Sequence, residues 1–286
     1  MDDSRAPLGA PTQNVVTPAP FPDASGPELA RRGHLSTGQE QHSSHGKLLV
    51  YGDFSSPNGC LASHRIDALK AVDVDIEWRA VELHPHLSVM GAPLTGPSST
   101  AADQAMSSVN ERLLPGEVLV WKKPTMTPHT QGSVAAFAEA VGAGVSDDVR
   151  QLLMTAYWTR GANIGDPEVL RRLIAGAIRR GHSTSDPLRR FGYAVSLSRG
   201  PITTSAYRRI RDWRTQWNEL ETHEDLAVVD EQGASTGLDA LDRLAALITE
   251  AGAPPNPVLP NPGRFPEVTL HPPLGWATTV GRSWDT

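Results

Sequence analysis

The spacing of hydrophobic residues changes twice between residues 47 and 250, and these changes limit the folds open to the chain. Residues 48–51 form a short apolar run typical of a buried strand, and residues 74–80 alternate apolar and polar side chains, as a half-buried strand does. Between them, Ala62, Ile66 and Leu69 share one face of a predicted helix. Two strands that flank one helix form a βαβ unit, whose crossover is almost always right-handed.

From about residue 100 the apolar residues recur every three or four positions, which is the spacing of amphipathic helices. One helix start is marked by Asp166, Pro167 and Glu168, because aspartate caps a helix, proline fits its first position and an acid suits its positive end. The apolar face of the last helix in this block consists of Ile210, Trp213, Trp217 and Leu220. The sequence therefore predicts a helical block over about residues 99–221.

Strand and helix patterns both return after this block. Residues 226–230 form a strand-like apolar run, residues 231–233 favour a turn, and residues 238–248 have one apolar helical face. The predicted order is thus βαβ, a helical block, and then ββα. This order predicts an α/β fold in which a thioredoxin-like sheet carries a large all-helical insertion.

The two ends of the chain differ in composition from its middle. Residues 1–45 are rich in Pro, Ser, Gly and Gln, residues 253–286 contain a run of prolines, and neither segment has a helical or strand period. Such segments bury too little apolar surface to offset the entropy lost on ordering. We therefore expect a disordered N-terminal tail, a folded domain over residues 46–252 and a Pro-rich C-terminal tail. That second tail is either disordered or docked on the domain through Leu270, Trp276 and Val280.

The composition excludes several classes of function. The formal net charge is −6, whereas domains that bind nucleic-acid backbones are usually basic. The sequence has neither a membrane-spanning apolar run nor a signal-peptide core after Met1. Cys60 is the only cysteine, so no disulfide can form within one chain and a two-cysteine redox cycle is excluded. We expect a cytoplasmic protein with no nucleic-acid or membrane partner.

Five stretches of the chain repeat, in order, the sequence pattern of one known family. They are residues 51–57 (YGDFSSP), 76–85 (IEWRAVELHP), 156–161 (AYWTRG), 164–170 (IGDPEVL) and 228–247. Together they resemble the DsbA-like thioredoxin-fold family, which includes dithiol oxidoreductases, kappa-class glutathione transferases and hydroxychromene-carboxylate isomerases. The resemblance covers roughly residues 47–250 and implies the same fold as the hydrophobic pattern does.

The resemblance also implies where a site would lie, and there the chain departs from the family. In the family that the chain resembles, redox members carry Cys-Pro-aromatic-Cys at the start of the first helix. This chain has Ser56, Pro57, Asn58 and Gly59 there. Transferase and isomerase members of that family carry Ser-Pro-Tyr at the same place, and their serine faces a small-molecule thiol. Ser56 and Pro57 match that version, whereas Asn58 replaces the aromatic residue.

The cis-proline that the family usually carries before its third strand is also replaced. By register with residues 228–230, its position falls near Asp225, next to Leu226. A cis bond before a residue other than proline costs about 2.5–4 kcal/mol, so we expect a trans bond and an altered pocket floor. The candidate catalytic residues are Ser56 and Cys60, and the candidate residues around a bound thiol are Pro57, Asn58, Asp225 and Leu226.

Two interpretations remain open for each candidate catalytic residue. Ser56 either hydrogen-bonds a thiolate and lowers the pKa of that thiol, or is an ordinary helix cap before Pro57. Cys60 is either a reactive thiol or a small buried hydrophobe, the commoner role of an unpaired cysteine. The two family cysteines would fall at residues 56 and 59, which favours the second interpretation of Cys60.

Other polar and aromatic residues allow weaker functional interpretations. His84 and His86 are spaced so that both could reach one metal ion, but no further ligand accompanies them, and a loop is favoured. His129 is expected in a solvated turn. Trp213 and Trp217 favour core packing first and an aromatic pocket wall second. The basic runs at 171–172, 179–180, 189–190 and 208–211 favour solvated helix faces.

Three hypotheses for function follow from these patterns and the resemblance. The first is an isomerase or transferase that acts on a small organic substrate with a low-molecular-weight thiol, glutathione or mycothiol, and without metal or nucleotide. The second is a non-catalytic thioredoxin-like scaffold that binds a partner or a biosynthetic intermediate. The third is a thiol oxidoreductase that works through Cys60 alone. Retention of Ser56 and Pro57 favours the first, and loss of both motif cysteines and of the cis-proline favours the second.

Overall fold

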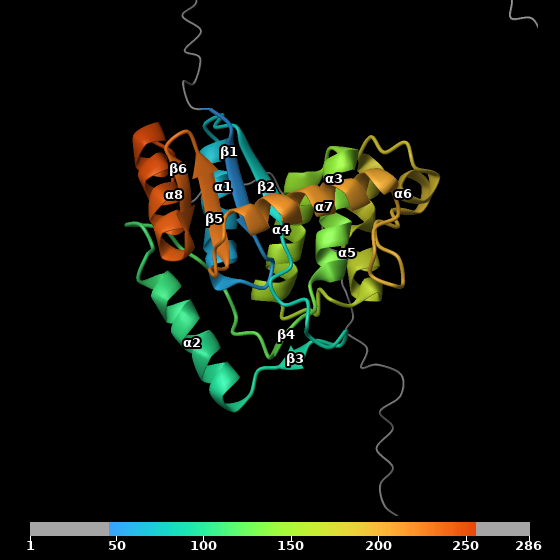
Figure 1. Cartoon of the computed structure of the whole chain (residues 1–286), viewed down its shortest axis with the longest axis horizontal. Coiled ribbons are helices and arrows are strands. Elements are labelled where there is room, and N and C mark those ends of the chain that lie inside the picture. The colour runs from blue at the N-terminus through green and yellow to red at the C-terminus, as the bar shows by residue number, and fades with distance from the viewer. Residues whose placement is uncertain (1–45, 256–286) are drawn as a thin grey trace, which may run out of the picture. The chain divides into compact units, whose positions relative to one another are not determined.

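The computed structural model describes residues 46–255 (Figure 1). The expected N-terminal tail lies outside these residues, and so does the expected C-terminal tail beyond residue 255. The first residues of that C-terminal segment contact the domain. Ala253 is buried, and the carbonyl of Pro255 accepts a hydrogen bond of 3.0 Å from Nε2 of His64.

A four-stranded sheet lies at the centre of the domain, in the order β2-β1-β5-β6 (Figure 1). Its strands are β1 (Leu48–Gly52), β2 (Ile76–Ala80), β5 (Leu226–Asp230) and β6 (Gly233–Thr236). The first pair, β1 and β2, is parallel and is joined by helix α1 (Pro57–Lys70), which is the predicted βαβ unit. The β1–β5 and β5–β6 pairs are antiparallel. The predicted α/β class with a thioredoxin-like sheet is confirmed.

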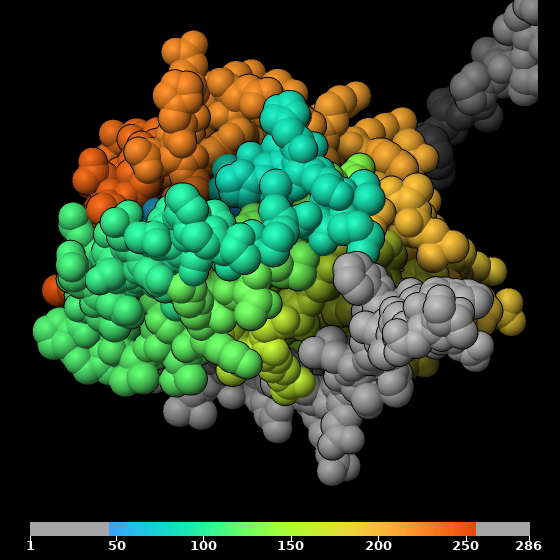
Figure 2. All heavy atoms as spheres, turned by 90° about the horizontal axis from the view of Figure 1, so that it is seen from below, coloured from blue at the N-terminus to red at the C-terminus, as the bar shows by residue number. Residues whose placement is uncertain are grey.

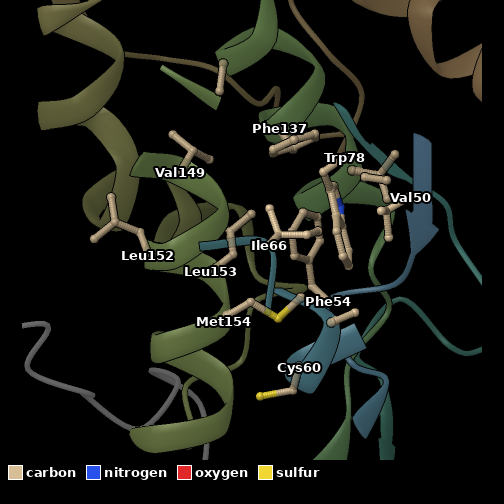
Figure 3. Close-up of a cluster of buried hydrophobic side chains, with 14 of the residues drawn as sticks. Val50, Phe54, Cys60, Ile66, Trp78, Phe137, Val149, Leu152, Leu153 and Met154 are labelled. Carbon is tan, nitrogen blue, oxygen red and sulfur yellow. The ribbon is translucent and has the colours of Figure 1, made fainter. Parts of the chain in front are cut away.

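Helices cover both faces of this sheet because side chains alternate along each strand. On one face, Leu48 and Val50 belong to a large buried core together with residues of α1 and of α8 (Gly237–Ala251). On the other face, Leu49 and Tyr51 pack with Trp217 of helix α7 (Thr204–Glu219). Figure 3 shows Val50, Ile66 and Trp78 meeting Phe54 and Phe137 in the larger core.

The insertion between β2 and β5 is mainly helical. Its elements are α2 (Gly96–Asn110), α3 (Gln131–Ala143), α4 (Ser146–Met154), the π-helix η1 (Thr155–Thr159), α5 (Pro167–Arg180), α6 (Asp186–Phe191) and α7. The predicted start of α5 is confirmed, since Oδ1 of Asp166 accepts a hydrogen bond of 2.8 Å from the Glu168 amide.

Two short strands also lie within the insertion. They are β3 (Ala92–Pro93) and β4 (Met126–Thr127), which pair antiparallel. Strands of two residues are too short to show a period of their own, so the sequence pattern did not predict them. Figure 2 views the face on which the segment from the end of β2 through α2 is exposed.

Two buried arginines fix α1 within the domain. The fully buried Arg65 donates to both carboxylate oxygens of Glu117, at 3.2 and 2.9 Å, and to the carbonyl of Leu241 at 2.7 Å. The guanidinium of Arg150 on α4 bonds the Ser63 carbonyl and the carboxylate of Asp67. The helix whose start carries the predicted site is thus tied to α4, to α8 and to the segment after α2.

Every helix within residues 46–255 is too short or too polar to cross a lipid bilayer.

Candidate functional site

Ser56 caps helix α1. Its backbone is extended (φ −83°, ψ 132°), Pro57 occupies the first helical turn, and its Oγ accepts a hydrogen bond of 3.0 Å from the Gly59 amide. The residue is only 4% exposed. Ser56 is therefore a helix cap, which is one of the two roles considered for it.

Asp225, the residue that the resemblance put at the family's proline position, lies over the start of α1. Its Oδ2 accepts a short hydrogen bond from the Ser56 hydroxyl, and its Oδ1 accepts one of 2.6 Å from Nδ2 of Asn58. All peptide bonds in residues 46–255 are trans, as expected at this position. Leu226 follows as the buried first residue of β5, opposite Gly52. The structure thus brings together residues 169 positions apart that the sequence placed in one site.

These contacts leave little room for a thiolate at Ser56. The only hydroxyl hydrogen of Ser56 points to Asp225, and its oxygen already accepts from Gly59. A thiolate placed here would also lie next to the Asp225 carboxylate, and two like charges in one site disfavour each other's ionised form. A thiol cofactor would have to displace the Asp225 side chain.

Cys60 lies one turn further along α1, in the core near Met154 (Figure 3). It is 7% exposed, and burial strongly raises the pKa of its thiol. A reactive cysteine needs exposure and a lowered pKa. The structure therefore favours the interpretation of Cys60 as a small core residue.

Asp53 holds the loop before Ser56 in place. Its Oδ1 accepts from the amide and hydroxyl of Ser55, at 2.7 and 2.8 Å. Its Oδ2 accepts from the Leu83 amide at 3.0 Å and from the Thr130 hydroxyl at 2.6 Å. This buried carboxylate joins the ends of β1 and β2 to the start of α3. On the other side, the indole of Trp158 in η1 donates to the Phe54 carbonyl at 3.0 Å.

A cavity of about 450 Å³ lies between the segment after β2, the start of α3, and α7. One wall consists of residues 222–224, which lead directly into Asp225, so the cavity neighbours the capped start of α1. Its apolar lining includes Val81, Leu83, Val134, Ala135, Ile210 and Trp217. Its polar lining includes Glu82, Arg199, Tyr207, Arg214, His223 and Glu224.

Arg199 enters the cavity wall from a compact turn before α7. Its backbone lies in the left-handed region, with φ of 67°, which is uncommon outside glycine. Two hydrogen bonds hold it there: its amide donates to the Ser196 carbonyl at 3.0 Å, and its Nε donates to the Gly165 carbonyl at 3.2 Å. Strained backbone held by its surroundings is concentrated at functional sites.

Glu82 and His129 form a buried pair at the cavity. Nδ1 of His129 and Oε1 of Glu82 are 3.5 Å apart, and neither atom has a hydrogen-bond partner among residues 46–255. Burial raises the pKa of Glu82. The nearby His129 opposes this rise, Asp53 adds to it, and Arg214 and the Gln131 amide oppose it further.

The expectation that His129 lies in a solvated turn was wrong. The residue is 7% exposed, because Thr130 is hydrogen-bonded to buried Asp53 and the His129 backbone packs directly against Gly165. Its neighbours in sequence are polar or proline, so the pattern around it resembles that of an exposed turn.

Several residues that line the cavity were not identified from the sequence. Arg214 follows a basic run that indicated a solvated face, and no local pattern marks Arg199 or Tyr207. Trp213 is buried in the core, as expected, with its ring 5.8 Å from that of Phe137. Trp217 is half-buried, packs 6.2 Å from the Tyr51 ring and lines the cavity, which is the second role considered for it.

Metal ligands do not gather in the described part of the chain. No group of three or more His, Cys, Asp or Glu side chains within residues 46–255 is arranged to hold a metal ion.

Comparison with known proteins supports the fold. No family model and no curated protein match the chain. Among solved structures, a probable DsbA oxidoreductase from Streptomyces coelicolor is 15% identical, with a TM-score of 0.52, and the match covers 73% of this chain and 90% of that one. The cytosolic disulfide reductase DsbM from Pseudomonas aeruginosa with GSH is 14% identical (TM-score 0.49, 71% and 98% covered). A 2-hydroxychromene-2-carboxylate isomerase is 18% identical (TM-score 0.48, 72% and 95% covered).

The fold assignment rests on the first of these structures and on the sheet and insertion described above. The chain has the DsbA-like thioredoxin fold.

Proposed function

We propose that the protein binds a small organic anion, a carboxylic acid with an apolar or aromatic body, in the cavity between β2 and α7. The observation that carries this proposal is the composition of the cavity wall. Arg199, Arg214 and Trp217 all line the cavity. A guanidinium group matches a carboxylate in shape and charge, and an aromatic ring supplies a broad apolar contact.

The size and position of the cavity support the same proposal. Ligand pockets usually measure about 300–1,000 Å³ and combine apolar walls with a few polar groups. This cavity, of about 450 Å³, meets both conditions and lies where the insertion joins the sheet. Isomerisation or group transfer on the bound acid is compatible with a single buried cysteine, whereas a dithiol cycle is not. The buried cysteine also supports a cytoplasmic location as part of the proposal.

A thiol-dependent isomerase or transferase is the second candidate. It is favoured by Ser56 and Pro57 at the start of the 14-residue helix α1, where a helix dipole stabilises an anion. Glutathione or mycothiol would then enter beside the cavity. The Asp225 carboxylate opposes this candidate, because it holds the Ser56 hydroxyl that would face the sulfur. If the protein catalyses no reaction, the remaining alternative is a non-catalytic scaffold that binds the same class of ligand.

Calorimetric titration separates these candidates. The full chain is titrated with benzoate, phthalate, succinate and glutathione, and saturable binding of at least one of the three simple acids is expected. Arg214→Gln should weaken that binding at least tenfold. Arg211→Gln, an exposed arginine on the same helix that does not line the cavity, is the matched control and should bind normally. Binding of glutathione alone would favour the thiol-dependent candidate, and equal binding by both variants would contradict the proposed site.

A further inference from the structure

A carboxyl oxygen and an imidazole nitrogen, neither with a hydrogen-bond partner among the described residues, meet at the inner side of the cavity. Glu82 lines the cavity, and His129 lies behind it, with side chains 16% and 8% exposed. Oε1 of Glu82 and Nδ1 of His129 face each other at 3.5 Å, and both atoms lack a hydrogen-bond partner among the described residues. Buried polar atoms are nearly always paired, and the exceptions are often catalytic.

We propose that Glu82 and His129 form an acid–base pair that moves a proton on the carboxylic acid bound in the cavity. This inference rests on the proposed function. Glu82 touches the bound acid and exchanges the proton with it, which makes Glu82 the catalytic residue. His129 does not line the cavity and is a positioning residue, which holds the carboxyl of Glu82 in place.

The charges around the pair suit this role. Asp53 at the end of β1 accepts four hydrogen bonds, which hold its carboxylate near Glu82. Arg214 approaches from α7, and the Gln131 amide from the start of α3. His223 and Glu224 face the cavity from the loop before β5. Burial and Asp53 together raise the pKa of Glu82, which moves it towards the range useful for a general base near neutral pH.

The step that these groups allow is a proton shift on a carbon acid. Glu82 removes a proton from the carbon next to a carbonyl group. The electron pair of that C–H bond forms a C=C bond to the carbonyl carbon, and the C=O π electrons move to the oxygen, which gives an enolate. The guanidinium groups in the wall stabilise the oxygen anion. In a substrate with a C=C bond next to the deprotonated carbon, the protonated Glu82 then returns the proton to the far carbon of that bond. The double bond shifts next to the carbonyl group as the C=O bond forms again. Substrate and product are isomers, so the step needs no oxidant, reductant or co-substrate.

Carbon-13 NMR of the Glu82 carboxyl tests the coupling of the pair without any ligand. Because His129 holds the pKa of Glu82 down, His129→Gln should move the Glu82 titration to higher pH. His182→Gln, at a histidine after α5 that faces neither residue, is the control and should leave the titration in place. An unchanged Glu82 titration in His129→Gln would overturn the pair.

A chromogenic carbon acid tests the base itself. Ring opening of 5-nitrobenzisoxazole begins with removal of a carbon-bound proton, and the N–O bond breaks to release a coloured phenolate. The full chain should open this probe faster than buffer does, and Glu82→Gln should reduce the rate at least tenfold, whereas Glu219→Gln at the exposed end of α7 should not. A rate equal to that of buffer, or an equal rate in Glu82→Gln, would overturn the proposal.

The same variant separates this inference from the proposed function. Glu82→Gln should still bind the simple acids in calorimetry, because the arginines remain. Normal binding with an unchanged rate would contradict the acid–base pair alone. If the unmodified chain binds none of the simple acids, the proposed function itself is contradicted.

Discussion

The hydroxyl of Ser56 donates its hydrogen to the carboxylate of Asp225, a residue 169 positions later in the chain. The same carboxylate accepts a hydrogen bond from Nδ2 of Asn58, so one acidic side chain holds two residues at the start of α1. Asp225 thereby occupies the place where the resemblance would put a thiol, and the cavity proposed to bind the ligand lies beside it.

The Ser56–Asp225 contact should be measurable as a coupling energy. Ser56→Ala removes a helix cap, which costs about 0.5–2 kcal/mol of the free energy of unfolding. Asp225→Ala leaves the serine without its acceptor. Because the two side chains bond each other directly, the double variant should differ from the sum of the single ones by about 0.5 kcal/mol or more in urea unfolding. Additive losses would mean that the contact contributes nothing to stability.

Removal of the Asp225 carboxylate should open the thiol position. We expect Asp225→Ala to bind glutathione at least several-fold more tightly than the unmodified chain, because the negative charge is gone and the Ser56 hydroxyl is released. Calorimetry measures both affinities. Asp212→Ala, at an exposed position on α7, serves as the control for a change of net charge. Equal glutathione affinity in Asp225→Ala and the parent would show that Asp225 does not close the site.

Cys60 should react only when the chain unfolds. Its thiol is buried and its pKa is raised, so little thiolate forms and reagents cannot reach it. A chromogenic disulfide reagent should label the native chain far more slowly than the chain in denaturant, and insulin disulfides should not be reduced above background. Rapid labelling of the native chain would restore Cys60 as a functional candidate.

The buried pair of Arg65 and Glu117 should dominate the stability of the α1 region. Both side chains are fully buried, so Glu117→Gln leaves an uncompensated guanidinium in the core. We expect a loss of about 3–5 kcal/mol in urea unfolding. Asp212→Asn, which breaks an exposed pair with Arg211, should cost at most about 1 kcal/mol. Similar losses for the two variants would contradict this account of the core.

Much of the fold could be predicted because the sequence patterns that indicate it each lie within a single helix or strand. The alternation in residues 74–80 and the cap at Asp166 arise within single elements, and both appear where expected. The register before β5 also placed Asp225 opposite the start of α1. That register did not show that Asp225 would bond Ser56 and Asn58, because it fixes a backbone position and not the direction of a side chain.

The cavity could not be predicted because it is assembled by packing. Arg199 enters through a left-handed residue in a turn, and Arg214 enters through the face of α7 that happens to meet the segment after β2. His129 is buried because Asp53, 76 positions earlier, anchors its neighbour Thr130. Each of these placements depends on contacts between distant segments, and none leaves a period or motif in the sequence.

The most direct test of the account uses the indole N–H signals of Trp217 and Trp213 in nitrogen-15 NMR. Both residues lie on α7, but only Trp217 lines the cavity, whereas Trp213 is buried in the core. During titration with benzoate, the Trp217 signal should move saturably, the Trp213 signal should stay in place, and Arg214→Gln should abolish the movement. A Trp217 signal that does not respond, or that responds equally in Arg214→Gln, would contradict the claim that a small organic anion binds in this cavity.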